Sequence, residues 1–222
     1  MSEPVKPRAY HSPVRVDRAR RSREAILAAA HRLFLADGYA RTSVAAIAAG
    51  AGVSEDLVYK LFTNKRGLVV EVLNFAVTGE PDGPPVLAQH RPQQVRAEPD
   101  QRRQLAMFAQ DIAGRTSRAR PVDDVIRSAG AVDIALAAQR SEMQQTRMAN
   151  LRAFVGWLAA NGPLRAGLDQ DEAAATVWTV TGPDVHRLLV DDLGWNQDRY
   201  RAWVHSTLEA TLLPPRDDTM DR

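Results

Sequence analysis

The chain has 222 residues, 45% of them hydrophobic, with 29 Lys and Arg residues against 27 Asp and Glu residues. This length allows one large domain or two small ones. The absence of cysteine excludes disulfides, thiolate catalysis and thiolate metal sites. No run of about 18 apolar residues predicts a membrane span, and the polar N-terminus does not look like a secretory signal. We therefore expect a cytoplasmic protein that makes no membrane contact.

The charge is distributed unevenly along the chain. Residues 1–68 contain 12 basic and 6 acidic residues, whereas residues 69–222 contain 17 and 21. All three lysines, Lys6, Lys60 and Lys65, lie in the basic part. A basic N-terminal segment indicates a polyanionic partner, although many charged clusters are only solvated faces.

Residues 1–17 carry three prolines and no apolar periodicity, which predicts a disordered basic arm. Several arginines lie at its end and just beyond it: Arg15, Arg18, Arg20, Arg21 and Arg23. Such an arm can enter the minor groove of DNA, or it can be a tail whose arginines only improve solubility. The sequence leaves both alternatives open.

Residues 18–78 predict a three-helix head followed by a connecting helix. The first helix carries an apolar stripe of Ile26, Ala29, Ala30, Leu33 and Phe34. Thr42 or Ser43, then Ser54 and Asn64, are suitable N-caps for the next three helices. Gly52 suits the sharp turn between the second and third helices, because glycine adopts a positive φ at little cost. This pattern predicts a helix-turn-helix over about residues 43–62, a device that places one helix in the major groove of DNA.

Five short motifs follow one another in this head. They are I-L-x-A-A-x-x-L-F from Ile26, G-Y at Gly38, T-S-V at Thr42, I-A-x-x-A-G-V-S from Ile47 and V-Y-x-x-F-x-x-K from Val58. In this order they resemble the DNA-binding head of the TetR/AcrR family of bacterial transcriptional regulators. The resemblance implies an all-α chain in which a larger helical domain, which binds a ligand and dimerises, follows the head.

The resemblance also implies a set of DNA contacts. Tyr59 would contact a phosphate and Lys60 a phosphate or a base edge, while Lys65 would hold a phosphate at the start of the fourth helix. Glu55 and Asp56 either favour the positive end of the third helix or accept a hydrogen bond from a cytosine amino group. The full set of predicted DNA-binding residues is Thr42, Ser43, Ser54, Glu55, Asp56, Tyr59, Lys60 and Lys65.

Two positions depart from the usual family pattern. Leu57 stands where a hydroxyl residue is common, and because the leucine side chain cannot form hydrogen bonds, that phosphate contact is not expected here. Gly67 stands where a glutamate commonly closes a capping box.

The body begins after a proline-rich segment, residues 79–99, which predicts a loop. Residues 100–215 show helical periodicity without strand alternation, and residues 216–222 form a tail. One helix is expected to begin at Pro121, because proline suits a helix start, and a long helix is expected from Val132 to Asn161.

The last helices are expected to form a dimer interface. The resemblance implies that the C-terminal helices of two subunits pack as a four-helix bundle, although the apolar stripe could instead pack within its own chain. A dimer would place two heads about 34–36 Å apart, so that they read palindromic double-stranded DNA. The predicted interface residues are Trp178, Val185, Leu189, Tyr200, Trp203, Val204, Thr207, Leu208, Thr211 and Leu212.

The resemblance further implies an effector pocket between the helices of the body. Methionine and aromatic side chains suit an adaptable apolar pocket, although on helix stripes they are more often plain core. The predicted lining residues are Met107, Phe108, Ile126, Met143, Phe154, Trp157 and Trp178. We expect an apolar or aromatic ligand, and Arg147, Arg152 and His186 could each orient an acidic group.

Enzymatic chemistry is not expected. The sequence contains no HExxH, Walker loop, GxSxG or GxGxxG pattern, so neither a metal nor a cofactor is predicted. The nearest metal-like cluster combines Asp184 and His186 with Asp191 and Asp192. The sequence therefore predicts a homodimeric regulator, most simply a repressor that a ligand releases from its operator. The alternatives are a sequence-tolerant architectural DNA-binding protein and a ligand-binding protein that has lost DNA binding.

Overall fold

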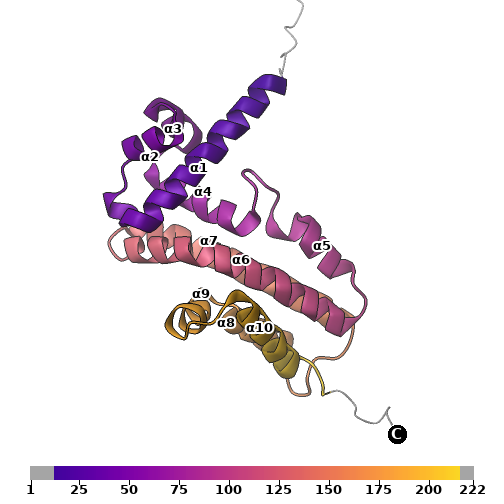
Figure 1. Cartoon of the computed structure of the whole chain (residues 1–222). Helices are drawn as coiled ribbons and strands as arrows, with labels where there is room; N and C mark the ends of the chain where they lie inside the picture. Colours follow the sequence, from indigo (N-terminus) through magenta and orange to yellow (C-terminus); the bar gives the residue numbers. More distant parts are fainter. Residues whose placement is uncertain (1–12, 216–222) are drawn as a thin grey trace, which may run out of the picture.

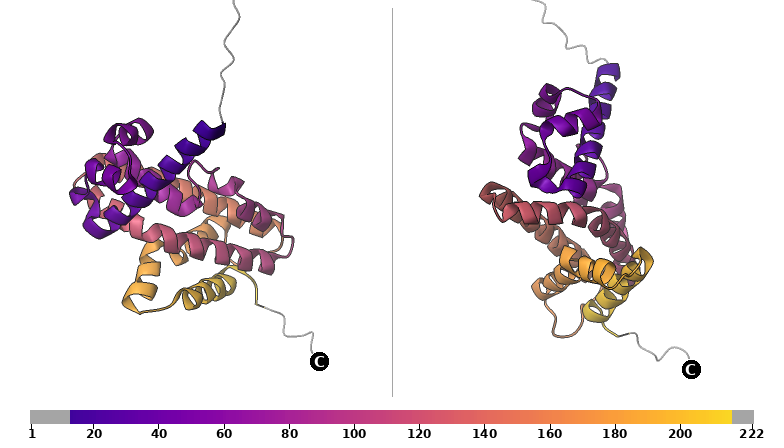
Figure 2. Two further views of the ribbon diagram at one scale, coloured as in Figure 1. Left: turned by 45° about the horizontal axis from the view of Figure 1, so that its top comes forward. Right: turned by 60° about the vertical axis from the view of Figure 1, so that its left-hand side comes forward.

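A computed structural model describes residues 13–215, with side chains from Asp17 onward, and this part of the chain is helical without any strand. The helices form three layers (Figure 1). The N-terminal head lies on one side of two long helices, α6 and α7, and the C-terminal helices lie on the other, as two further views confirm (Figure 2). The predicted all-α fold is confirmed, while residues 1–12 and the tail at 216–222 lie outside the described residues.

The head has the predicted succession of helices, α1 (Pro13–Arg41), α2 (Val44–Ala51), α3 (Glu55–Phe62) and the connecting helix α4 (Lys65–Thr78). One boundary differs from expectation, because residues 13–17 belong to α1 and not to the predicted disordered arm. Helix α1 is also interrupted at Gly38, where φ is 75°.

Short polar side chains begin the helices of the head as predicted. Ser43 Oγ accepts a hydrogen bond from the Ala46 N–H, and Ser54 Oγ accepts one from the Leu57 N–H. The left-handed conformation of Gly52, with φ at 67°, ends α2 and turns the chain into α3. These local interactions explain why the helix-turn-helix could be located from the sequence.

The head and the body share one hydrophobic core. Buried residues of α1, α2 and α3 form a single cluster with α4, and the same cluster includes Val122, Ile126 and Leu136 from α6 and α7. Leu68, Val69 and Val72 of α4 are fully buried within it. The connecting helix is therefore packed between the helix-turn-helix and the body.

The body contains a short 3-10 helix, a π-helical segment and six α-helices. Their bounds are Val86–Ala88 (3-10), α5 (His90–Ala97), α6 (Gln101–Gly130), α7 (Ile134–Ala160), α8 (Gln170–Val180), α9 (Pro183–His186), Arg187–Asp192 (π) and α10 (Gln197–Leu212). The predicted long helix from Val132 to Asn161 is close to α7.

Two expectations based on proline are wrong. The segment 79–99 is not a continuous loop, because it contains α5 with Pro92 in its first turn. Proline is tolerated there, since the first N–H groups of a helix lack intrahelical partners. Pro121 lies inside α6 and does not start a helix. Buried side chains on both sides of it, including Ala113 and Val122, hold this helix together.

The turn between α3 and α4 explains one departure from the family pattern. Thr63 has a positive φ of 64°, and this conformation brings the Phe62 carbonyl close to the backbone of Gly67. A Cβ atom at position 67 would lie 2.6 Å from that carbonyl oxygen. The turn therefore excludes the glutamate that would close a capping box, and Asn64 Oδ1 alone accepts from the Gly67 N–H at 2.8 Å.

Replacing Gly67 with alanine should therefore destabilise the protein, even though alanine favours helices. We expect Gly67→Ala to lower the free energy of unfolding by about 1–3 kcal/mol, because overpacking forces the backbone to move. The measurement is urea unfolding followed by circular dichroism. Gly114→Ala in α6 is the matched control, since its Cβ would meet only Arg118 Nη1 at 3.6 Å. A stabilising effect of Gly67→Ala would contradict this view of the turn.

Candidate nucleic-acid interface and ligand cavity

Helix α3 presents one polar face to solvent and one apolar face to the core. Val58 and Phe62 are buried, whereas Tyr59 is 48% exposed and Lys60 is exposed. Glu55 and Asp56 are exposed in the first turn of the helix. This face carries a phenol, an ammonium and two carboxylates, so it can both bind phosphate and accept hydrogen bonds from bases.

The two serine caps add hydroxyl groups beside this face. Ser43 and Ser54 are exposed, and each uses its oxygen to accept a backbone N–H at the start of α2 or α3. A hydroxyl that accepts such a bond still has its own hydrogen to donate. Both residues can therefore cap a helix and contact a phosphate at the same time.

Thr42 does not occupy the predicted DNA-facing position. The side chain is 3% exposed, and its Oγ1 donates to the carbonyl of Gly38 at 2.8 Å and to that of Leu33 at 3.2 Å. These bonds satisfy carbonyl groups at the end of α1. Thr42 is thus a structural residue, and its predicted phosphate contact is wrong because its hydroxyl points inward.

Lys65 is likewise directed into the protein. Its Nζ donates to the carbonyls of Tyr39 at 3.0 Å and Thr42 at 3.1 Å, and lies 4.4 Å from the centre of the Tyr39 ring. The ammonium group therefore attaches the start of α4 to the end of α1. These two bonds use two of the three ammonium hydrogens, and the predicted phosphate contact of Lys65 stays a prediction.

Arg23, one of the arginines that follow the predicted arm, packs into the interior of the head. Its Nη2 lies 2.7 Å from Glu71 Oε2 and 3.0 Å from Asp82 Oδ1, and the guanidinium lies 4.6 Å from the centre of the Phe62 ring. The side chain is 14% exposed. With two carboxylates beside it, Arg23 connects α1 to α3, to α4 and to the loop after α4.

An ion pair between head and body was also missed by sequence reasoning. Arg66 in the first turn of α4 donates to Asp133 Oδ2 at 3.2 Å, in the connection between α6 and α7. The backbone N–H of Leu136 and then Arg66 lower the pKa of the Asp133 carboxyl group. No sequence signal indicated this pair, because the two residues are far apart in the chain.

A cavity of about 680 Å³ lies between α4, the loop at 80–87, α6 and α7. Four of the predicted lining residues line it, namely Phe108, Met143, Phe154 and Trp157. Phe108 and Phe154 stack with their ring centroids 3.5 Å apart. The cavity borders Glu71, Leu73 and Thr78 of α4, so its contents can contact the connecting helix directly.

Three predicted lining residues lie elsewhere. Ile126 is fully buried in the core shared with the head, and Met107 packs against the C-terminal core. Trp178 does not line the cavity and instead contacts Arg147, whose guanidinium carbon is 4.4 Å from the indole centre. Neighbouring positions on a helix face different directions, so Phe108 lines the cavity while Met107 does not.

The cavity also has a polar lining that the sequence suggested only at Arg147. Its Nη2 donates to the Trp178 carbonyl at 3.1 Å and to Thr181 Oγ1 at 2.8 Å. Burial lowers the pKa of Arg147 to about 10. Of the other two residues proposed to orient an acidic group, Arg152 is exposed beside Asp171 and does not line this cavity.

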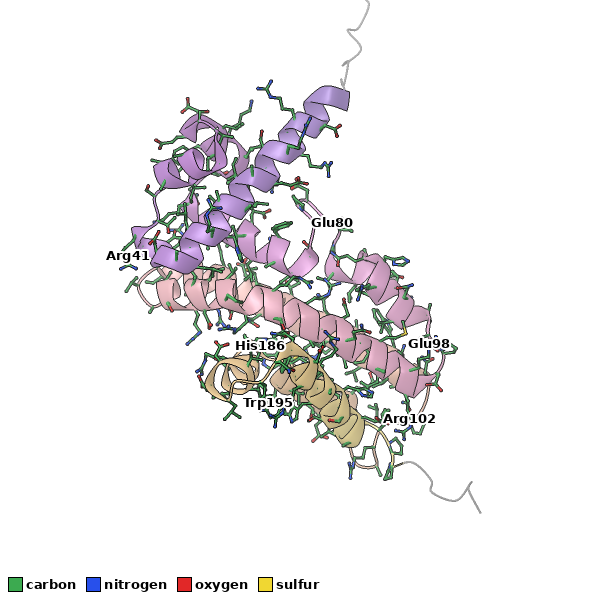
Figure 3. All side chains as sticks on the ribbon, viewed as in Figure 1. Arg41, Glu80, Glu98, Arg102, His186 and Trp195 are labelled. Atoms are coloured by element: carbon green, nitrogen blue, oxygen red, sulfur yellow. The ribbon has the colours of Figure 1, made fainter. Side chains whose placement is uncertain are left out.

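His186 lies away from the cavity. It is buried among the C-terminal helices, on the opposite side of α6 from Glu80, which borders the cavity (Figure 3). Its Nε2 is 3.0 Å from Ser117 Oγ, and burial lowers the pKa of the imidazole. Asp191 pairs with Arg120 and Asp192 with Arg187. Between residues 13 and 215, no three acidic or histidine side chains form a group that could hold a metal.

The apolar stripe of α10 packs inside its own chain. Tyr200, Val204, Leu208 and Leu212 are fully buried. As dimer contacts these four residues are wrong predictions, because their side chains fill the core between α10, α6 and α8. The other predicted interface residues are only half-buried: Trp178, Val185, Leu189, Trp203, Thr207 and Thr211.

No helix within the described range is both long and apolar enough to cross a bilayer. Residues 26–72 match the model of a family described as bacterial regulatory proteins, tetR family. Among curated proteins, no sequence matches this chain significantly. The family match confirms the resemblance of the head.

The described fold is similar to those of solved bacterial regulators. The NalD repressor of a multidrug efflux pump in Pseudomonas aeruginosa is 21% identical, with a TM-score of 0.69 over 90% of this chain and 100% of that chain. A Saccharomonospora viridis transcriptional regulator in complex with choline is 16% identical, with a TM-score of 0.66 over 87% and 98%. FadR from Bacillus subtilis in complex with stearoyl-CoA is 17% identical, with a TM-score of 0.61 over 83% and 96%.

The two lysines of the helix-turn-helix region should respond differently to substitution. Lys65→Met leaves two carbonyls without a donor, so we expect the free energy of unfolding to fall by about 1–3 kcal/mol. Lys60→Met removes an exposed charge and should change the free energy of unfolding by no more than about 0.5 kcal/mol. Urea unfolding of the two variants makes the comparison. Equal effects would mean that Lys65 does not have the structural role assigned to it.

Proposed function

We propose that this protein is a homodimeric, sequence-specific DNA-binding regulator whose affinity for its operator is controlled by a small molecule in the body. The observation that carries the proposal is the polar outer face of α3, displayed by a capped helix-turn-helix that matches the tetR family. In the simplest form the protein is a repressor, and the ligand releases it from DNA.

The DNA contacts follow from the exposure of the side chains. Tyr59 and Lys60 approach the phosphates or base edges, and the hydroxyls of Ser43 and Ser54 donate to phosphates at the ends of α2 and α3. Glu55 and Asp56 repel phosphate, so their useful partners in the major groove are cytosine amino groups. These carboxylates favour sequence-specific reading over general attraction to DNA.

Helix α4 can transmit a displacement caused by a bound ligand to the helices that contact DNA. Its first turn is held in the head by Lys65, while Leu73 and Thr78 border the cavity. A ligand that displaces the end of α4 must therefore move the head or break buried contacts. Such a ligand must prefer the conformation with low DNA affinity, and DNA must weaken ligand binding by the same factor. The choline and stearoyl-CoA complexes of similar folds support a small-molecule ligand.

Dimerisation would use the outer face of α10. Ser206 and Ala210 are exposed there, and Trp203 and Thr207 are half-buried beside them. Small residues at this spacing allow a second helix to approach closely. The fully buried residues of the same helix hold it rigidly on its own subunit, so it can serve as a stable docking element.

Sequence-specific DNA binding can be tested directly. Selection from a random duplex library at about 150 mM salt should recover a palindrome, with specific binding roughly 10³-fold or more tighter than non-specific binding. The Tyr59→Ala/Lys60→Ala double variant should lose this selection, and Lys60→Ala alone should lower the salt slope by about 1. Arg103→Ala is the control, because Arg103 is an exposed arginine of the body. Recovery of no motif, with equal weak binding by all variants, would instead indicate an architectural DNA-binding protein.

The proposed dimer interface can be tested by a substitution on the outer face of α10. Ser206→Arg places a long charged side chain on the proposed interface, so we expect a monomer in sedimentation equilibrium and weaker binding to the palindrome. The unfolding transition of the subunit should persist, because Ser206 is exposed. Asp198→Arg, at the other exposed edge of α10, should remain dimeric. An unchanged dimer for both variants would place the interface elsewhere.

A further inference from the structure

We propose that the ligand of the central cavity is an organic anion, with its acidic group neutralised by Arg147 and its apolar or aromatic body against Phe108, Phe154 and Trp157. This inference deepens the proposed function and rests on it only in treating the cavity as the effector site. The binding chemistry itself can be tested without DNA.

Of the three arginines that line the cavity, Arg147 alone has no ion-pair partner among the described residues. Arg115 pairs with Asp111 at 2.7 Å, and Arg120 pairs with Asp124 and Asp191. Arg147 forms no ion pair with any residue of the described range. The acidic groups around the cavity are mostly occupied as well.

Four of the five acidic residues that line the cavity have arginine partners, and the fifth, Glu80, is exposed to solvent. Asp123 accepts two hydrogen bonds from Arg140, at 2.9 and 2.8 Å. Glu71 and Asp82 lie beside Arg23. No rearrangement within these pairs would provide Arg147 with a carboxylate unless another buried arginine lost its own. An incoming ligand is therefore the simplest source of the missing negative charge.

The position of the Arg147 guanidinium is fixed by neutral groups. One face lies over the Trp178 ring, and Nη2 donates to the Trp178 carbonyl and to Thr181 Oγ1. Nη1 is shielded from solvent and has no acceptor. Holding a cation away from water without a carboxylate in contact is costly, and because Arg147 lines the cavity, an anion there would supply the missing counter-charge.

The remainder of the cavity favours an apolar ligand body. The stacked rings of Phe108 and Phe154, together with Trp157 and Met143, form one part of the lining, and Pro81, Pro84 and Pro85 contribute from the loop. A volume of about 680 Å³ lies within the range of about 300–1,000 Å³ that is usual for drug-sized ligands. A neutral ligand would leave Arg147 without a carboxylate in contact, and a quaternary ammonium ligand would be repelled by it.

Two fluorescent probes of matched shape test the inference. 8-Anilinonaphthalene-1-sulfonate carries an anionic group, and N-phenyl-1-naphthylamine is the same ring system without it. We expect the wild-type protein to bind the sulfonate more tightly. Arg147→Met should weaken sulfonate binding by about 10-fold or more, since hydrogen bonds to charged groups contribute about that factor. Binding of the neutral probe should change by less than about 2-fold on the same reasoning.

Three further variants control the comparison. Arg147→Lys keeps the charge and should retain the preference for the sulfonate. Arg152→Met removes an exposed arginine of the same helix and should change neither affinity. Phe108→Ala should weaken both probes, which places them in the cavity. Circular dichroism verifies that each variant is folded.

The inference is overturned if Arg147→Met leaves the ratio of the two affinities unchanged, if the wild type prefers the neutral probe, or if Phe108→Ala affects neither probe. Failure of the proposed function would be seen separately, as the absence of a selected DNA sequence. An anion preference lost in Arg147→Met would support the cavity chemistry whatever the outcome with DNA.

Discussion

The packing of α4 between head and body is the constraint on which the rest of the structure depends. Its buried side chains Leu68, Val69 and Val72 belong to the same core as α1 and α2 on one side and α6 on the other. A close-packed core transmits displacement because it has few voids to absorb it. The head can therefore change its position only together with α4, and the cavity is bordered by the far end of that helix.

Buried arginines divide into two kinds in this protein. Arg23 is surrounded by Glu71 and Asp82, and it holds α1, α4 and the following loop together. Arg147 has only neutral hydrogen-bond acceptors and an aromatic face, and its Nη1 is shielded from solvent. The first arrangement contains its own counter-charges, whereas the second has no carboxylate in contact and would gain a counter-charge from an anionic ligand. This difference separates a structural arginine from a candidate ligand-binding one.

The sequence was most informative where structure is local. The caps at Ser54 and Asn64 and the turn at Gly52 depend on residues a few positions apart, and all three were predicted correctly. Thr42 and Lys65 were correctly placed at helix ends, yet both side chains point inward. Which way a polar side chain points depends on carbonyl groups from other helices, which no local pattern specifies.

By itself, the sequence determined the all-α class, the helix-turn-helix and the polar face of α3, because helical periodicity and capping act over a few residues. The tertiary structure decided which apolar residues line a cavity, so that Phe108 borders it and Ile126 does not. It also decided that the stripe of α10 fills its own subunit and that Arg147 has no acidic partner. These properties depend on side chains brought together from distant parts of the chain, whose distances and burial arise only when the helices pack.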